Sequence, residues 1–480
     1  MERSLWARSL VWCAALLLGA AACTGRGGPG PRATERPVTG TQLVIATGLD
    51  VTGKYGIRKR LVDAWNALQE KQGSPWRARA VLLPGSADLQ RSQLLAALQS
   101  GSAAYDVVNL DVTWVPEFAA AGLVRELPAE YADDGDVLPG VAATARWKGK
   151  VYAAPYNSDV GLLYYRRDYL VPGAGIDEEK IKALSRRGTP WDELAGLMDT
   201  ADAWARAEKS DRKGNYRNAW TSQLAAYEGL TVNAVEAFAS AGVRLTDDDG
   251  VYRATPGELT KGVAEFRRRT ESAHTLDGAF ESDEAGTLKD FAEGRTAFLR
   301  HWPYAYRTLH AALGEERLGV VPLPGTAVLG GQDLAVAAGP AMPGARAEKA
   351  RELVRFLTGP ASERCLLDAG FAATRRSAYT DPGVVCDDRR AAPSAGAPPE
   401  GGERDMPRDA DHRPRYARTT LLPALESAAL RPRTPLYGAF TQAFTGVLSR
   451  LHSSAAARRE ADGEVAEELD AALRGVLPGG

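Results

Sequence analysis

The 480-residue chain carries many residues that could do chemistry, but they form no known catalytic or metal-binding pattern. Its five histidines are far apart and lack metal-ligand spacing. A Gly25-x-Gly27-x-x-Gly30 match follows no strand-like segment and is interrupted by Pro29, so it does not indicate a nucleotide site. We therefore expect no metal and no cofactor. Glycosidase carboxylates have no fixed spacing, so a glycoside-active enzyme stays an alternative.

The first residues have the pattern of a secretory signal peptide. A basic start precedes an apolar run over residues 10–18 and a small-residue patch that ends at Cys23. The run is shorter than the ~20 residues that span a bilayer. The pattern resembles the lipobox of bacterial lipoproteins, except that Ala20 stands where leucine is usual. We predict a signal peptide over residues 1–22 and a lipid on Cys23; ordinary cleavage beside an unmodified cysteine is the alternative.

Whether Cys365 and Cys386 can form a disulfide depends on export of the chain. Residues 23–40 are rich in Gly and Pro and have no hydrophobic period, which predicts a lipidated flexible tether. Cys365 and Cys386 then lie in an oxidising compartment, where disulfides persist. Their bond would close a loop of ~20 residues. Two buried free thiols are the alternative, because the sequence does not show how close the two cysteines come.

Composition describes an ordinary globular protein. Apolar residues make up 44% of the chain and charged residues 25%, and the formal net charge is −2. This balance provides no overall field that would attract nucleic acid. No second apolar segment approaches the length of a membrane span. We expect a mature body that touches the membrane only through the lipid.

Hydrophobic periodicity predicts strands and helices in alternation. The early segments are a strand over 43–46, a helix over 57–69, a strand over 78–83, a helix over 88–99 and a strand over 106–110. This alternation is typical of a parallel sheet with helices on both faces. Later segments predict a strand at 161–165, helices at 191–209, 232–241, 347–357 and 465–476, and a turn between two short strands at 246–251. The fold class is α/β.

Eight short stretches, in order, resemble the family 1 extracellular solute-binding proteins, the sugar-type receptors of ABC importers. They are Tyr105-Asp106-Val107-Val108 with Asp111 and Trp114, Trp147-x-Gly149-x-Val151-Tyr152-x-x-Pro155-Tyr156, Tyr227-Glu228-Gly229, Phe291-x-x-Gly294-Arg295-x-Ala297-Phe298, Trp302, Gly330-Gly331 with Leu334-Ala335-Val336, Ala350 to Thr358, and Arg431-Pro432-x-Thr434-Pro435-x-Tyr437. Each is weak alone; their order over residues 41 to about 475 carries the resemblance.

The resemblance implies a two-lobe, periplasmic-binding-protein-like (type II, Venus-flytrap) fold with the ligand cleft between the lobes. It divides the chain into an N-lobe first part (41–157), a C-lobe first part (158–324), an N-lobe return (325–373) and a C-lobe return (374–480). A polar segment at 387–416 is expected to be a surface insertion or loop. In such open sheets ligands bind beyond the carboxyl ends of the strands.

Aromatic and polar residues near those stretches are the candidate ligand contacts. Trp302 is the strongest aromatic candidate, because similar sugar receptors place a stacking ring just after the stretch that ends at Phe298. The other aromatic candidates are Trp114, Tyr156 and Trp220, and for each the alternative is a core residue. The polar candidates are Asp50, Asp111, Asp159, Glu228 and Arg375, with a surface charge as the alternative. Gly330 and Gly331 would allow the backbone to approach a ligand closely.

These features predict a binding protein without enzymatic activity. The expected function is capture of a di- or oligosaccharide by lobe closure and delivery to the transmembrane subunits of an ABC permease. The protein would be a monomer that binds no nucleic acid, anchored by its lipid to the outer face of the cell membrane. Alternatives are a non-sugar solute, a role as a sensory partner, or a secreted glycoside-active enzyme.

Overall fold

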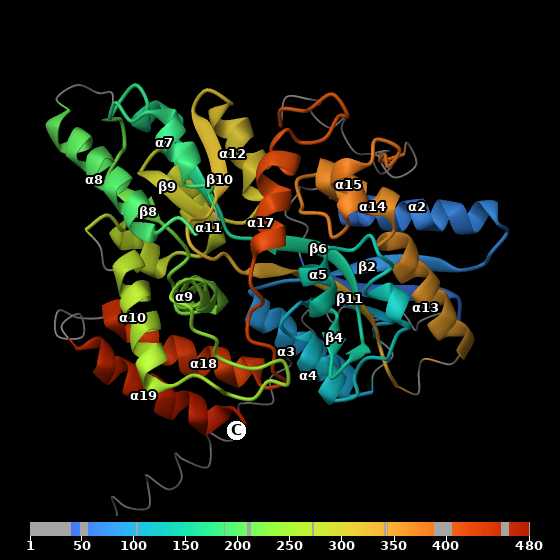
Figure 1. Ribbon diagram of the computed structural model, residues 1–480. Helices are drawn as coiled ribbons and strands as arrows, with labels where there is room; N and C mark the ends of the chain where they lie inside the picture. The colour runs from blue at the N-terminus through green and yellow to red at the C-terminus, as the bar shows by residue number, and fades with distance from the viewer. Residues whose placement is uncertain are drawn as a thin grey trace, which may run out of the picture. The chain divides into compact units, whose positions relative to one another are not determined.

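The first sheet has five strands in the order β2-β1-β3-β11-β6 (Figure 1). β1 (Gln42–Gly48) pairs in parallel with β2 (Arg77–Leu83) and β3 (Val107–Asp111). The connecting helices are α2 (Ile57–Lys71) and α3 (Ala87–Gln99), so the predicted β-α-β-α-β unit is confirmed. β11 (Leu329–Val336) runs antiparallel between β3 and β6 (Ala154–Val160). The computed structural model describes residues 40–48, 56–101, 104–186, 188–208, 213–270, 273–339, 342, 344–387, 406–452 and 460–479.

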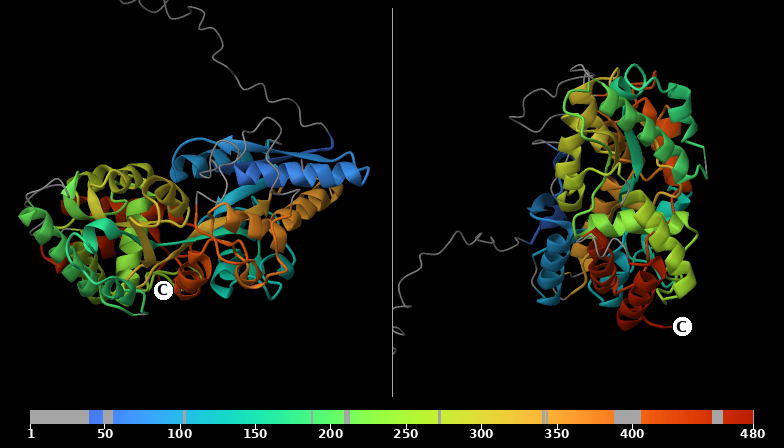
Figure 2. Two further views of the ribbon diagram at one scale, coloured as in Figure 1. Left: turned by 90° about the horizontal axis from the view of Figure 1, so that it is seen from above. Right: turned by 90° about the vertical axis from the view of Figure 1, so that its left-hand side faces the viewer.

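This sheet is the centre of the N-lobe. Its apolar strands are buried because helices pack against them. Leu43, Val44 and Ala46 are fully buried in β1, and Trp65 of α2 is buried beside them. α2 lies against α13 (Gly344–Leu357) and α14 (Pro360–Asp368), as Figure 2 shows. Cys365 of α14 forms a disulfide with Cys386, with a Cα–Cα distance of 4.7 Å. α14 and the Cys365–Cys386 disulfide hold the segment that follows β11 against the N-lobe.

The second sheet has four strands in the order β10-β7-β9-β8 and forms the C-lobe (Figure 1). β7 (Leu162–Arg166) pairs antiparallel with both β10 (Leu318–Pro322) and β9 (Thr296–His301), while β8 (Asn218–Thr221) runs parallel to β9. The helix predicted at 191–209 is α8 (Trp191–Ala207), and the one predicted at 232–241 is α9, which begins earlier (Glu228–Ser240).

A helical layer completes the C-lobe. α10 (Pro256–Thr270) packs on α9 and on α19 (Asp462–Val476), and α18 (Tyr437–Leu448) contacts α9 and α19. The elements not yet named are α4 (Val115–Ala120), η1 (Ala129–Tyr131), α5 (Pro139–Thr144), β4 (Arg146–Trp147), β5 (Lys150–Val151), α6 (Arg167–Leu170), α7 (Glu178–Ala183), η3 (Asp277–Glu281), α11 (Glu284–Ala292), α12 (Ala305–Leu313), α15 (Arg376–Thr380), η5 (Ala417–Leu421), α17 (Leu422–Ser427) and η6 (Ser449–His452).

The chain passes between the sheets at two points that the strand order defines. It leaves β6 of the first sheet for β7 of the second at Gly161, and it returns from β10 to β11 through residues 323–328. A Cβ at Gly161 would lie 2.3 Å from a carboxylate oxygen of Glu236, so only glycine fits this crossing without displacing that side chain.

The expected surface insertion is described only in part. Residues 388–405 lie outside the described residues, and residues 406–416 are an irregular segment in which Ala410, His412 and Arg415 are exposed while Met406, Arg413 and Tyr416 are buried. Arg413 is fully buried and donates to the backbone oxygens of Ala378 and Asp381. The segment is polar because it supplies buried hydrogen bonds, a use that composition alone does not reveal. Within the described part of the chain, no helix has the length and hydropathy to cross a membrane.

Candidate functional site

Arg431 joins the two lobes through three hydrogen bonds. Its Nη2 donates over 2.8 Å to Oδ1 of Asp111, the last residue of β3 in the N-lobe sheet. Its Nη1 donates over 2.7 Å to Oε1 of Glu228, the first residue of α9 in the C-lobe. Nε donates to the backbone oxygen of Leu329 at 3.1 Å. A buried guanidinium with two carboxylate partners therefore fixes the edges of both lobes at one point.

The Glu228 carboxylate is held from the C-lobe as well. Tyr437 donates to Oε1 at 2.6 Å and Thr441 donates to Oε2 at 3.2 Å. Burial raises the pKa of Glu228 to about 7, although Arg431 opposes the rise. Burial lowers the pKa of Arg431, but Asp111, Tyr437 and Glu228 outweigh it and hold that pKa above its usual value. The guanidinium therefore stays charged while Glu228 titrates close to neutral pH.

Asp159 contributes a carboxylate oxygen with no partner. Its Oδ1 is buried and accepts no hydrogen bond from the residues that the structure describes. Burial raises the pKa of Asp159 to about 7, with Arg58 opposing and Asp111 adding to the rise. A buried acceptor left unpaired is costly, so this oxygen is suited to a hydroxyl donated by a ligand.

Trp302 lies next to Asp159, with Gly330 between them. Asp159 in β6 and Gly330 in β11 are paired across the sheet. A Cβ at Gly330 would lie 3.2 Å from the Asp159 Cβ and 3.2 Å from Cζ3 of the indole. The absence of a side chain at Gly330 thus brings an N-lobe carboxylate beside a C-lobe ring.

The Trp302 ring is half-buried and is supported from behind. The Arg300 guanidinium lies over it, 3.9 Å from the ring centroid. Arg300 is itself held by Glu236 through bonds of 2.7 and 3.0 Å, and Tyr164 donates to the backbone oxygen of Trp302 at 2.9 Å. A cation against one face fixes the ring in place and leaves its partly exposed surface for other contacts.

A row of polar side chains on the N-lobe sheet was not among the sequence-based candidates. Arg58 of α2 donates to Thr47 at 3.2 Å and to Asn157 at 3.0 Å. The Asn109 amide donates to Thr47 and to Gln332, both at 2.9 Å. Thr47 and Asn109 interrupt the apolar runs of β1 and β3 near their carboxyl ends, and that interruption is the signal that could have found these two members of the row.

The other predicted contacts lie elsewhere in the structure. Trp114, Tyr156 and Trp220 are packed in apolar clusters and are at most 6% exposed, which fits the core alternative. Arg375 donates to the backbone of Thr358 and to Asp134, so it supports a loop. Asp50 and Cys23 lie outside the described residues.

Gly331 has a backbone role. Its φ is 111°, and a Cβ there would lie 2.3 Å from the backbone oxygen of Asn157, so a side chain cannot be accommodated. Its own carbonyl accepts from the Val112 amide at 3.1 Å. Among the described residues, no group of three histidine, cysteine or carboxylate side chains is arranged to hold a metal ion.

The chain belongs to the family of bacterial extracellular solute-binding proteins, whose sequence profile matches residues 67–391. A family of this kind acts outside the cytoplasm and delivers small molecules to the permeases of ABC importers. A "Probable ABC transporter-binding protein" of Deinococcus radiodurans is 27% identical over 347 residues, which cover 68% of this chain and 74% of the relative.

Solved structures share the two-lobe fold. Maltose-bound MalE3 of T. maritima has a TM-score of 0.68 and 22% identity, covering 91% of this chain and all of that one. The GacH receptor of Streptomyces glaucescens, solved with acarbose, has a TM-score of 0.66 at 18% identity over 91% of this chain and 98% of its own. UgpB of Mycobacterium tuberculosis, in complex with glycerophosphocholine, also has a TM-score of 0.66, at 18% identity over 94% and 98%.

Proposed function

We propose that this protein captures a sugar, specifically a di- or oligosaccharide, for an ABC importer. The observation that carries the proposal is the Trp302 ring beside the unpartnered Asp159 oxygen, with only Gly330 between them. A partly exposed indole offers apolar ring surface to the C–H groups of a pyranose, and a carboxylate accepts from its hydroxyls. The proximity of these two groups supports the proposal.

The same arrangement supports capture by lobe closure. Asp159 belongs to a strand of the N-lobe sheet, and Trp302 follows a strand of the C-lobe sheet. A sugar that touches both residues stabilises the conformation in which they are close, because a ligand shifts an equilibrium by its differential affinity for the two states. The expected divisions, 41–157 with 325–373 for the N-lobe and 158–324 with 374–480 for the C-lobe, belong to this proposal with one change. Because β6 runs to Val160 in the N-lobe sheet, the first boundary moves to Gly161, and Asp159 lies in the N-lobe.

The proposal includes the membrane attachment. A lipid on Cys23 and the tether up to residue 40 would keep the receptor, as a monomer, near its permease at the outer face of the cell membrane. The pattern of residues 1–23 supports this part. Mass spectrometry of the mature N-terminus tests it: a diacylglycerol-modified Cys23 is expected, and a chain starting with unmodified Cys23 would contradict it.

A non-sugar solute is the second candidate, and one structural relative has glycerophosphocholine in its complex. The unpartnered carboxylate of Asp159, once ionised, disfavours a simple anion at the site, because like charges repel. A sensory rather than transporting role would use the same site and the same closure. No enzymatic activity is proposed.

A thermal-unfolding screen tests the sugar claim directly. Purified protein is heated with mono-, di- and trisaccharides, glycerophosphocholine and glycerol 3-phosphate. We expect one sugar class to raise the unfolding midpoint, since ligand at 100 times its Kd adds about 2.7 kcal/mol to the unfolding free energy. A rise with glycerophosphocholine and with no sugar would overturn the sugar assignment while leaving the family assignment intact.

A further inference from the structure

A buried ion pair in the C-lobe lies directly behind the Trp302 ring. Arg300 of β9 and Glu236 of α9 are each 1% exposed and are joined by hydrogen bonds of 2.7 and 3.0 Å. The same guanidinium lies 3.9 Å from the centroid of the Trp302 ring. Two parallel bonds to one carboxylate fix the plane of a guanidinium, so Glu236 determines how Arg300 faces the ring.

The first crossing between the lobes, at Gly161, is packed against this pair. A Cβ at Gly161 would lie 2.3 Å from Oε1 of Glu236 and 3.0 Å from Nη2 of Arg300. The backbone of the crossing therefore leaves room for both charged groups only because it carries no side chain. A shift of this backbone toward the pair would displace it, because a close-packed interior has no free volume to absorb the overlap.

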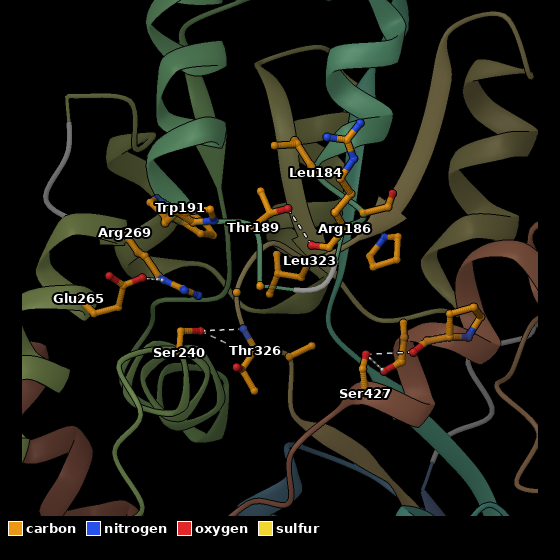
Figure 3. Close-up of a pocket in the computed structure, with 18 of the residues that line it drawn as sticks. Leu184, Arg186, Thr189, Trp191, Ser240, Glu265, Arg269, Leu323, Thr326 and Ser427 are labelled. Atoms are coloured by element: carbon orange, nitrogen blue, oxygen red, sulfur yellow. Dashed lines mark hydrogen bonds and ion pairs between the residues drawn. The ribbon is translucent and has the colours of Figure 1, made fainter.

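The second crossing, residues 323–328, is bonded to the same helix. The Val328 amide donates to Oε1 of Glu236 at 3.4 Å, and the Thr326 amide donates to Oγ of Ser240 at 2.8 Å. Figure 3 shows the bond between Ser240 and Thr326 on the wall of a C-lobe cavity. Glu236 and Ser240 are one turn apart on α9, so they meet the crossing from one face of the helix.

Gln223 completes the support of Arg300. Its Oε1 accepts from Nη1 at 3.4 Å, and its Nε2 donates to Thr287 at 2.7 Å and to the backbone oxygen of Arg300 at 3.1 Å. Nε, Nη1 and Nη2 of Arg300 thus all have acceptors in the C-lobe. The ion pair needs no ligand to satisfy it, so its contribution to the site is the placement of the ring.

We propose that Glu236 is a positioning residue of the sugar site, which acts through Arg300 and links the Trp302 ring to both crossings. This inference rests on the proposed function, because it assigns a role in sugar binding. Closure of the lobes changes the backbone at the crossings, and a pair in contact with both transmits that change to the ring. Sugar affinity therefore depends on residues that the sugar does not contact.

Fluorine NMR of fluorotryptophan-labelled protein tests the placement of the ring without any ligand. The Trp302 resonance is the one that Trp302→Phe removes. The double variant Glu236→Gln with Arg300→Gln should shift it, and this variant leaves no unpaired charge in the interior. Gly161→Ala, which places a Cβ against the Glu236 carboxylate, should shift the same resonance. Either variant keeps the test valid if the other fails to fold.

Each variant has a matched control. The double variant Asp106→Asn with Arg346→Gln removes another buried ion pair, which lies in the N-lobe. Gly257→Ala adds a Cβ that meets nothing within 4 Å. Both controls should leave the Trp302 resonance unchanged, so a general loss of stability is distinguished from a change at the ring.

Calorimetric titration with the sugar found by the thermal screen measures the effect on binding. The two variants should bind about fivefold more weakly than the wild type, and this loss should disappear in the Trp302→Ala background, because the pair acts through that ring. A Trp302 resonance that neither variant shifts, or a loss that persists in full in Trp302→Ala, would overturn the proposal. If no sugar binds to the wild type, the proposed function fails; a shifted resonance then still supports the positioning role of Glu236, and an unshifted one overturns it.

Discussion

Arg431 donates from Nη2 to Oδ1 of Asp111 over 2.8 Å, although the two residues are 320 positions apart in the sequence. The same guanidinium binds Glu228 across the lobe boundary. A buried cation thus holds two carboxylates that would otherwise repel each other. This relationship makes the region between the lobes sensitive to both substitution and pH.

Replacement of Arg431 should destabilise the fold strongly. Arg431→Met leaves two carboxylates without their cation, and removal of one partner from a buried ion pair costs about 3–5 kcal/mol of unfolding free energy. Chemical denaturation at pH 8 measures it. Arg450→Met, which breaks an exposed ion pair with Glu468, is the control and should cost at most about 1 kcal/mol. Equal stability of the two variants would contradict the bridging role.

Stability should fall as the pH rises from about 4.5 to about 7. Burial raises the pKa of Glu228 and of Asp159 to about 7 in the folded protein, above their values in the unfolded chain. In that window the folded state binds more protons than the unfolded state, so the unfolding free energy decreases with pH until both groups are ionised.

Asp159→Asn isolates one group in this pH dependence. Because the amide does not titrate, the unfolding free energy of this variant should decrease less between pH 5 and 7 than that of the wild type. Denaturation curves at steps of half a pH unit measure the difference. Asp248→Asn, at an exposed carboxylate paired with Arg244, should leave the profile unchanged. A stability that rises through this window in the wild type would show that the buried carboxylates do not titrate as described.

Sugar affinity should depend on the space at Gly330. A side chain there would meet both the Asp159 Cβ and the Trp302 ring at 3.2 Å, so Gly330→Val should weaken sugar binding by at least about tenfold, or 1.4 kcal/mol. Gly257→Ala is the matched control, because nothing lies within 4 Å of a Cβ there and affinity should be unchanged. If Gly330→Val bound the sugar with wild-type affinity, the ligand would not contact the space at Gly330.

Loss of the Cys365–Cys386 bond should destabilise the N-lobe. The bond closes a loop with a sequence separation of 21, and the chain-entropy model assigns about 3 kcal/mol to a loop of this length. Thermal unfolding of Cys386→Ser, or of wild-type protein in reducing buffer, measures the effect. If reduction left the midpoint unchanged, this bond would contribute nothing to the stability of the N-lobe.

Hydrophobic periodicity was enough to predict the three parallel strands β1, β2 and β3 of the first sheet, but not its strand β6 or the antiparallel strand β11. The apolar runs at 43–46 and 106–110 with two amphipathic helices between them leave few alternatives to a parallel β-α-β-α-β unit. α9 begins four residues before its predicted start, with Glu228 in its first turn, where an acidic residue is favourable.

The candidate site was harder to predict, because its contacts join residues that are distant in sequence. Asp111, Asp159, Glu228, Trp302 and Gly330 were selected from the family-like stretches, and the structure brings them together. Arg431 lay in such a stretch but was not selected, since its partners are 320 and 203 positions away. Trp114 and Trp220 show the converse difficulty: residue type alone does not distinguish a buried indole from one that contacts a ligand.

The central claim is that a sugar binds against Trp302, and calorimetric titration of the sugar found in the thermal screen tests it most directly. The wild type and Trp76→Ala, a partly buried tryptophan of the N-lobe far from this ring in the fold, should bind with the same Kd. Trp302→Ala should bind at least about tenfold more weakly, because the stacking surface is lost. Unchanged affinity in Trp302→Ala, with the fold intact, would contradict the account.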